Sequence, residues 1–242
     1  MDAVDWEMDD GQGWTIYHSA ALGGSLPKGF TKWEARTSEG LTVAHVAAKH
    51  GCLPGDFNQW ELAGETGWTV AHFAAQFGTL PKNFSRWELA TPSGWTVAHE
   101  AARGGVLPMN FENWELADQN GWTVAHEAAA SGNLPPGFYE WGLAEESGWT
   151  VAHAAAAVGE LPGGFDKWDL ADDYGWTVAH EAARRGNLPE DFNQWELDGE
   201  TGWTVAHVFA LKSLSDPPSL NCREVMCMTR LEWAPEERGF SV

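Results

Sequence analysis

One tripeptide recurs along the chain at a fixed spacing. Gly-Trp-Thr, with Leu once in place of Trp, begins every 27 residues at Gly13, Gly40, Gly67, Gly94, Gly121, Gly148, Gly175 and Gly202. A fixed period of about 20 to 50 residues indicates a solenoid, a propeller or a linear array. Propeller blades need four β-rich segments in about 40 to 50 residues, whereas this unit is alanine-rich and carries two helix-start signals. The period therefore predicts an all-α, helical-repeat solenoid of about eight stacked units.

The first helix of each unit is expected to begin after the Thr of Trp-Thr-Val-Ala-His. In the fourth unit this residue is Thr96, whose hydroxyl can accept a hydrogen bond from a backbone N–H of the first turn. The alanine-rich stretch that follows favours a helix as far as Arg103. Gly104 or Gly105 is expected to end it.

A second, shorter helix is predicted from the Leu-Pro of each unit, as in Leu188-Pro189. Proline suits a first helical turn because its missing N–H has no partner there to lose. Phe192 and Trp195 follow at helical spacing, on a helix of about two turns that neighbouring units must hold in place. The acidic, Gly-bearing stretch 116–121 then predicts a turn or hairpin. Each unit is thus expected to be helix-turn-helix.

The unit Gly-Trp-Thr-Val-Ala-His-x-Ala-Ala-x-x-Gly resembles the ankyrin repeat pattern G-x-T-P-L-H-x-A-A-x-x-G over residues 9–213. Two departures are clear: Val97 and Ala98 and their equivalents replace Pro and Leu, and the unit has 27 residues against about 33. The missing residues fall in the second helix and its loop. The resemblance implies a protein-binding scaffold whose turn tips and inner helix face carry the partner contacts.

One histidine recurs in every unit: His18, His45, His72, His99, His126, His153, His180 and His207. Equivalent positions of stacked helices lie about 8 to 10 Å apart, too far to share one zinc ion. The zinc-protease pattern H-E-x-x-H is absent, because Arg103, Ala130 and Arg184 stand at its last position. His126 and Glu127 point about 100° apart on a helix, which disfavours a catalytic pair. The ankyrin resemblance implies instead that each His bonds the Thr three residues earlier and a loop backbone, tying units together.

Two aromatic series are predicted to form the core. The first is the tryptophan series, which we call the ladder Trp: Trp6, Trp33, Trp60, Trp87, Trp114, Trp141, Trp168 and Trp195. The second is the series Phe30, Phe57, Phe84, Phe111, Phe138, Phe165 and Phe192. Burial of one such side chain contributes roughly 1.5 to 3 kcal/mol, enough to compensate for short helices.

The ankyrin resemblance also selects candidate partner-binding residues. A second tryptophan series, the hairpin Trp, follows the turn glycine and either packs or contacts a partner: Trp14, Trp68, Trp95, Trp122, Trp149, Trp176 and Trp203. The pair before the second glycine of each unit includes Lys49, His50, Gln76, Phe77, Arg103, Arg184 and Arg185. The turn tips include Gln119, Asn120, Glu146, Ser147 and Tyr174. Variation on a fixed frame suits a recognition surface, although loosely constrained solvated positions vary too.

The chain is strongly acidic, with 14 Lys and Arg against 35 Asp and Glu and a formal net charge of -21. This charge disfavours direct binding of nucleic acid or anionic membrane and favours basic or apolar protein partners. An acid follows the ladder Trp in all but one unit: Glu7, Glu34, Glu61, Glu88, Glu115, Asp169 and Glu196. Such a row allows an alternative function, an inhibitor that mimics nucleic acid in a basic groove. Simple solubility explains the same acidity.

The remaining features indicate a soluble, non-enzymatic protein with no cofactor or metal. No P-loop, G-x-S-x-G or paired-cysteine motif is present, and three irregularly spaced cysteines favour a reducing compartment. The acidic N-terminus lacks signal-peptide character and no run of about 18 apolar residues occurs, so we expect a cytoplasmic protein. Residues 1–12 are expected to be a half-repeat cap, 13–213 the repeats and 214–242 a capping tail.

Overall fold

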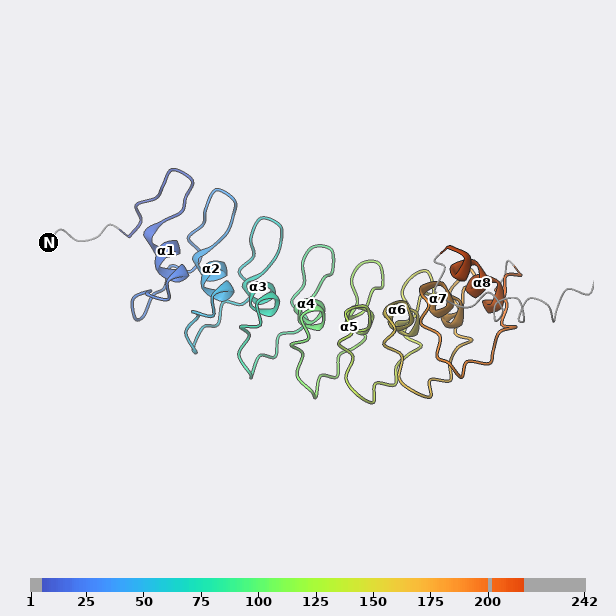
Figure 1. Ribbon diagram of the computed structural model, residues 1–242. Coiled ribbons are helices and arrows are strands. Elements are labelled where there is room, and N and C mark those ends of the chain that lie inside the picture. The colour runs from blue at the N-terminus through green and yellow to red at the C-terminus, as the bar shows by residue number, and fades with distance from the viewer. Residues whose placement is uncertain (1–5, 200–201, 216–242) are drawn as a thin grey trace, which may run out of the picture.

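The computed structural model describes residues 6–199 and 202–215. Within these residues the chain forms eight helices and no strand. The helices are α1 (Ile16–Leu22), α2 (Val43–Lys49), α3 (Val70–Gln76), α4 (Val97–Arg103), α5 (Val124–Ala130), α6 (Val151–Val158), α7 (Val178–Arg185) and α8 (Val205–Ser215). They stand side by side in chain order, each in contact with the next (Figure 1). The predicted all-α repeat stack is confirmed.

Each helix begins where the sequence predicts it. Thr96 precedes α4 in extended conformation, and its hydroxyl accepts a hydrogen bond from the His99 backbone N–H. A second hydrogen bond joins the same two residues, because His99 Nδ1 accepts from the Thr96 backbone N–H at 3.1 Å. Two N–H groups that would lack a partner in the first turn are therefore satisfied. The helix ends at Arg103 with Gly104 as its cap, as expected.

The predicted second helix is wrong for the part of the chain described. The Leu188-Pro189 segment forms two separate turns: Phe192 N–H bonds the Pro189 carbonyl at 3.1 Å, and Leu197 N–H bonds that of Gln194 at 3.2 Å. A helical nucleus costs more entropy than one hydrogen bond returns, so a stretch this short stays as single turns. Each unit therefore has one helix, which removes the helix-turn-helix and accounts for the short 27-residue period.

The stretch after the ladder Trp folds into the expected hairpin. In the unit before α5, Ala117 and Thr123 form an antiparallel bridge, and Gly121 turns the chain in the left-handed region at φ 77°. Adjacent hairpins are hydrogen-bonded, since Glu146 N–H donates to the Asn120 carbonyl at 3.3 Å. The hairpins therefore stack unit on unit alongside the helices.

The two aromatic series alternate to form one continuous ladder. Phe138 meets Trp141 of its own turn segment edge to face, with ring centroids 5.2 Å apart, and Trp141 meets Phe165 of the next at 5.5 Å. The same pair of contacts repeats from Phe30 to Trp195, and the ladder ends on Phe209 of α8. Members of both series are buried or half-buried, so the predicted core role is confirmed. Edge-to-face packing adds about 0.5–1.5 kcal/mol per pair beyond burial.

The recurring histidines tie neighbouring units together, as the expected structural role requires. The His126 Nε2 lies 2.9 Å from the Trp149 carbonyl of the next hairpin, and its Nδ1 lies 2.7 Å from Thr123 Oγ1. A carbonyl can only accept, so Nε2 carries the proton and Nδ1 accepts. The histidines of the first seven units are fully buried and each bonds the carbonyl 23 residues later.

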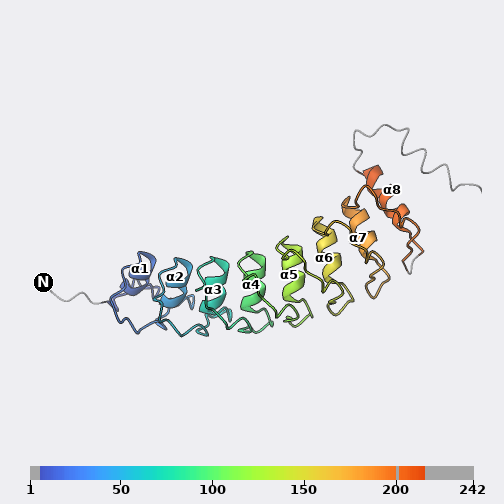
Figure 2. The same cartoon turned by 90° about the horizontal axis from the view of Figure 1, so that it is seen from below.

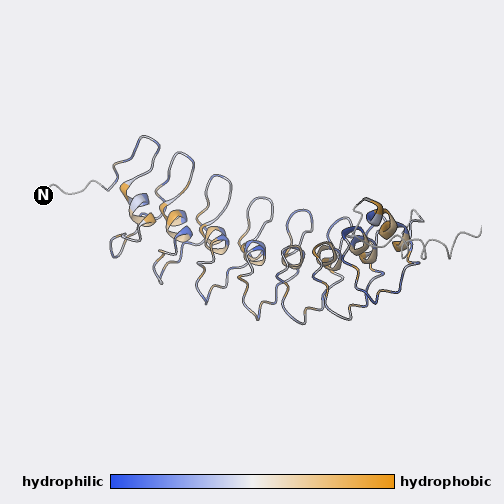
Figure 3. Ribbon diagram, viewed as in Figure 1, coloured by the Kyte–Doolittle hydropathy of each residue, from blue (hydrophilic) through white to orange (hydrophobic). Residues whose placement is uncertain are grey.

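The row of helices is bent rather than straight (Figure 2). The helices carry most of the hydrophobic colour of Figure 3, and the loops on either side are more polar. At the N-terminal end Trp6 stacks on Tyr17 with centroids 5.6 Å apart, so the half-repeat packs on the first unit. At the other end α8 continues to Ser215, past the expected boundary at 213. Most of the predicted capping tail, 216–242, lies outside the described residues.

Candidate protein-binding surface

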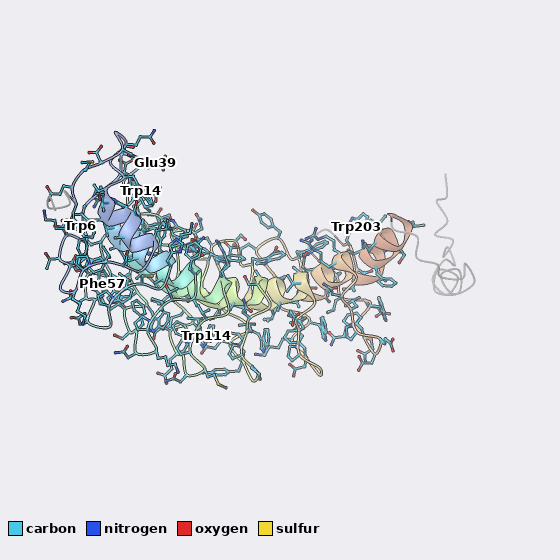
Figure 4. The ribbon with its side chains drawn as sticks, turned by 60° about the vertical axis from the view of Figure 1, so that its left-hand side comes forward. Trp6, Trp14, Glu39, Phe57, Trp114 and Trp203 are labelled. Carbon is cyan, nitrogen blue, oxygen red and sulfur yellow. The ribbon has the colours of Figure 1, made fainter. Side chains whose placement is uncertain are left out.

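The stack has two different sides. Figure 4 shows Trp14 and Trp203 on one side of the helix row and Phe57 and Trp114 on the other. We call these the hairpin side and the ladder side. The hairpin side lies on the inside of the bend. The two tryptophan series therefore separate, and most of the predicted partner-binding residues belong to the hairpin side.

The hairpin Trp are packed on the recurring histidines, and all of them except the exposed Trp203 are half-buried. The Trp95 ring stacks on His99 with centroids 4.7 Å apart, and the Trp95 indole N–H donates to Glu100 Oε2 at 3.2 Å. Trp122 and Trp176 make the same pair of contacts in their own units. Each of these indole rings packs one face on the histidine and donates its N–H to the glutamate of the same unit. The rest of the ring is exposed at the surface.

The glutamate after the histidine is a structural residue that the sequence reasoning missed. Glu100, Glu127 and Glu181 are buried, and each accepts the indole N–H five residues earlier. Burial raises the pKa of the Glu100 carboxyl. The signal in the sequence is a Trp-to-Glu spacing of five residues in units four, five and seven, which differs from the zinc-motif and catalytic-pair interpretations of the His-Glu dipeptide.

Arg103 joins two units on the hairpin side. Its guanidinium lies 4.7 Å from the centroid of the Trp95 ring, and its Nε donates to Glu127 Oε1 of the next unit at 2.8 Å. Its Nη1 is 3.6 Å from Glu100 Oε2. The guanidinium therefore covers two buried carboxylates and one indole face, an arrangement stabilised by charge and by cation–π attraction.

Three predicted residues meet in one hollow between the third and fourth units. Trp68, Trp95 and Arg103 line a hollow of about 370 Å³, together with loop residues Thr66, Thr91, Pro92 and Ser93. The hollow is open to solvent and combines two indole rings with a guanidinium. Aromatic and arginine side chains in a depression are the groups that most often anchor a protein partner.

A larger groove lies between α7 and α8. It measures about 720 Å³, and Tyr174, Trp176 and Arg184 line it together with Trp203 and Leu211. The Tyr174 ring is 73% exposed and contributes open apolar surface. Arg184 and Arg185 both bond the buried Glu181 carboxylate, at 2.6 and 3.0 Å. Trp203 belongs to the predicted hairpin Trp series, whereas Leu211 was not predicted; the two complete the apolar lining.

The remaining predicted residues are distributed along the hairpin loops and helices. Phe77 is exposed beneath the Lys49 ammonium, 5.3 Å from its ring centroid. Gln119 donates from its side chain to the Pro92 carbonyl at 2.7 Å, and its neighbour Asn120 is exposed. The others are the half-buried Trp122 and Trp149 and the exposed Glu146, which line neither of the two hollows described above.

The seven fully buried histidines of the first seven units are held in hydrogen bonds between units. Across residues 6–199 and 202–215, no group of three His, Cys, Asp or Glu could hold a metal ion. Both ring nitrogens of His126 are engaged, one with Thr123 and one with the Trp149 carbonyl. Burial lowers the pKa of these imidazoles, to about 4 for His45, so they are neutral near pH 7.

Comparison with known proteins adds no family. No protein-family model matches the chain, and no curated protein matches it. In the part of the chain that the structure describes, no helix is both long and apolar enough to cross a membrane.

Proposed function

We propose that this protein is a non-enzymatic, ankyrin-like protein-binding scaffold, an adaptor or inhibitor, that uses the hairpin side of its stack. The observation that carries the proposal is the pairing of aromatic rings with arginines in two open hollows, Trp68 and Trp95 with Arg103 and Tyr174 and Trp176 with Arg184. The tryptophans recur in nearly every unit, whereas the residue type changes between units at the positions of Tyr174, Arg103 and Arg184. A fixed frame with variable anchors suits selection of one partner.

The test is capture of host-lysate proteins on the immobilised full chain, with a hairpin-side variant and a ladder-side control. Tyr174→Ala removes an exposed ring that makes no hydrogen bond through its side chain among the described residues, so the fold is expected to persist. Glu115→Ala removes an exposed carboxylate on the ladder side. We expect a salt-resistant partner to be lost with Tyr174→Ala and retained with Glu115→Ala. Retention by both variants would exclude the groove between α7 and α8.

A second candidate function rests on the ladder side. The acids after the ladder Trp are exposed in each unit that has one, and Arg86 pairs with Glu61 at 2.7 Å across two units. An exposed carboxylate row supports the alternative of an inhibitor that mimics nucleic acid in a basic groove. In the same capture experiment, this candidate predicts a set of basic nucleic-acid-binding proteins that is released at high salt and weakened by Glu115→Ala. We also propose that the protein acts in the cytoplasm without a cofactor.

A further inference from the structure

Among the described residues, no further unit covers the C-terminal end of the eighth unit. In the first seven units the recurring histidine is fully buried and bonds a carbonyl of the following hairpin, but His207 of the eighth unit is exposed. The position 23 residues after His207 is Arg230, outside the described residues. Among the described residues, the side chains of Trp203, Leu211 and Leu214 are exposed at this end. The end therefore presents the surface that a following unit covers elsewhere.

The hairpin glycine of the eighth unit, Gly202, independently shows that no described hairpin packs on this end. A Cβ placed on Gly148 would lie 2.7 Å from the Asp173 backbone nitrogen, because the next hairpin packs directly on it. A Cβ placed on Gly202 would meet no described atom within 4 Å. The eighth hairpin retains the left-handed glycine, at φ 72°, that the stacked hairpins share. It is shaped for a neighbour that the described residues do not supply.

The chain beyond α8 contains a degraded copy of the missing segment. Residues 228–234 read Met-Thr-Arg-Leu-Glu-Trp-Ala, and residues 84–90 read Phe-Ser-Arg-Trp-Glu-Leu-Ala. Residues 239–242 read Gly-Phe-Ser-Val, against Gly-Trp-Thr-Val at 94–97. Arg, Glu, Ala, Gly and Val are identical, both hydroxyl positions keep a hydroxyl, and Phe240 keeps an aromatic ring at the hairpin Trp position. Trp and Leu exchange places around the shared Glu, and Met replaces the ladder Phe. One extra residue separates the two blocks in the copy.

The replacement of the ladder Phe by Met228 in residues 228–242 agrees with the structure of the eighth unit. In a regular unit Trp168 meets the Phe192 ring of the next turn segment, but Trp195 meets Phe209 of α8 instead. Phe209 stands where the other units have alanine, and it already fills the next place in the ladder. The copy has Met228 at the ladder Phe position, and a flexible thioether suits a partly filled space.

The connection is long enough for this copy to reach the end of the stack. Thirteen positions separate Ser215 from Met228, whereas seven separate the α7 residue Arg185 from Phe192. An extended chain spans up to about 3.3–3.6 Å per residue, so the extra length leaves slack. We propose that residues 228–242 bind the uncovered end of the eighth unit as a ninth, partial unit, with the Phe240 carbonyl accepting a hydrogen bond from His207 Nε2.

Hydrogen exchange measured by mass spectrometry tests this proposal on the full chain and on a chain that ends at Cys227. We expect the amides of residues 202–208 to exchange at least about tenfold faster in the shortened chain, because a covering unit suppresses local opening. Equal rates in the two chains would overturn the proposal. Protection of the full chain that increases with protein concentration would also overturn it, since a second copy would then be the occupant.

Point variants keep the test decisive if the shortened chain fails to fold. Phe240→Asp places a charge at the position equivalent to a hairpin Trp, and we expect it to raise exchange at 202–208 to the level of the shortened chain. Asn221→Asp introduces the same charge outside the copied pattern and should leave exchange unchanged. Equal effects of the two substitutions would contradict the proposed register. Partner capture by the hairpin side is measured separately, so failure here leaves the proposed function standing.

Discussion

At the residue scale, the recurring histidine links each of the first seven units to the next. In each buried imidazole, Nδ1 accepts a hydrogen bond from the Thr that caps the helix, and Nε2 donates to a carbonyl of the next hairpin. One side chain therefore bonds two units. The group tolerates burial because both nitrogens have partners. The exposed His50 is the matched contrast, since it caps α2 and belongs to no such bridge.

Replacing one bridging histidine should therefore destabilise the whole protein. We expect His126→Ala to lower the free energy of unfolding by about 2 to 4 kcal/mol, because it removes the bond to the next hairpin, leaves the Thr123 backbone N–H without its acceptor and opens a cavity. His50→Ala should change it by less than about 0.5 kcal/mol. Urea unfolding followed by circular dichroism measures both. A loss for His126→Ala no larger than for His50→Ala would show that the bridge contributes little.

The same burial makes stability depend on pH. Because the folded pKa of His45 is lowered from 6.5 to about 4, the unfolded chain binds its proton first as the pH falls. The contribution of neutral His45 to the free energy of unfolding is fully present above pH 6.5. It is lost progressively as the pH falls to about 4, and for His45 alone it amounts to roughly 3 kcal/mol. We expect the melting temperature to fall between pH 7 and 5. His45→Gln, which cannot titrate, should show a shallower fall than the native chain.

At the element scale, the helices could be predicted and the turn segments could not. Thr96 and Gly104 mark the bounds of α4 because capping acts locally, within a few residues of sequence. Pro189 and Phe192 have helical spacing but form only a single turn, since ladder contacts with neighbouring units decide that segment. The contact of Arg103 with Glu127 was likewise beyond sequence reasoning, because it joins residues of different units.

The stacked hairpins give a prediction at this scale. Gly148→Ala should lower the free energy of unfolding by about 3 kcal/mol, because a Cβ there strains a residue at φ 79° and collides with the Asp173 backbone. Gly137→Ala is the control: its φ is 83°, but a Cβ meets nothing within 4 Å, so only the strain of about 1–2 kcal/mol remains. Chemical denaturation of both variants separates packing from strain, and equal losses would show that the hairpins do not pack closely.

At the scale of the whole molecule, each helix of the described residues contacts only the helices next to it in the chain, so the stack is one-dimensional. Its stability should follow a sum of unit terms and nearest-neighbour interfaces. The ends are then the only places where a unit lacks a neighbour. Trp6 packs on Tyr17 at one end, and Phe209 closes the aromatic ladder at the other. Loss of an interior unit should leave both ends and the remaining interfaces intact.

Deletion of residues 148–174 removes one whole unit and joins Ser147 to Gly175, a junction of the same type as the native Ser147–Gly148. We expect the shortened protein to fold with α5 beside α7, because the Thr, His, Trp and Phe positions stay in register. The denaturant m-value should fall by about one eighth, in proportion to the surface buried. Deletion of residues 148–160 removes α6 but retains the ladder segment at 161–174, so it breaks the period and should abolish cooperative unfolding. If both deletions gave equally cooperative transitions, stability would not depend on the 27-residue register.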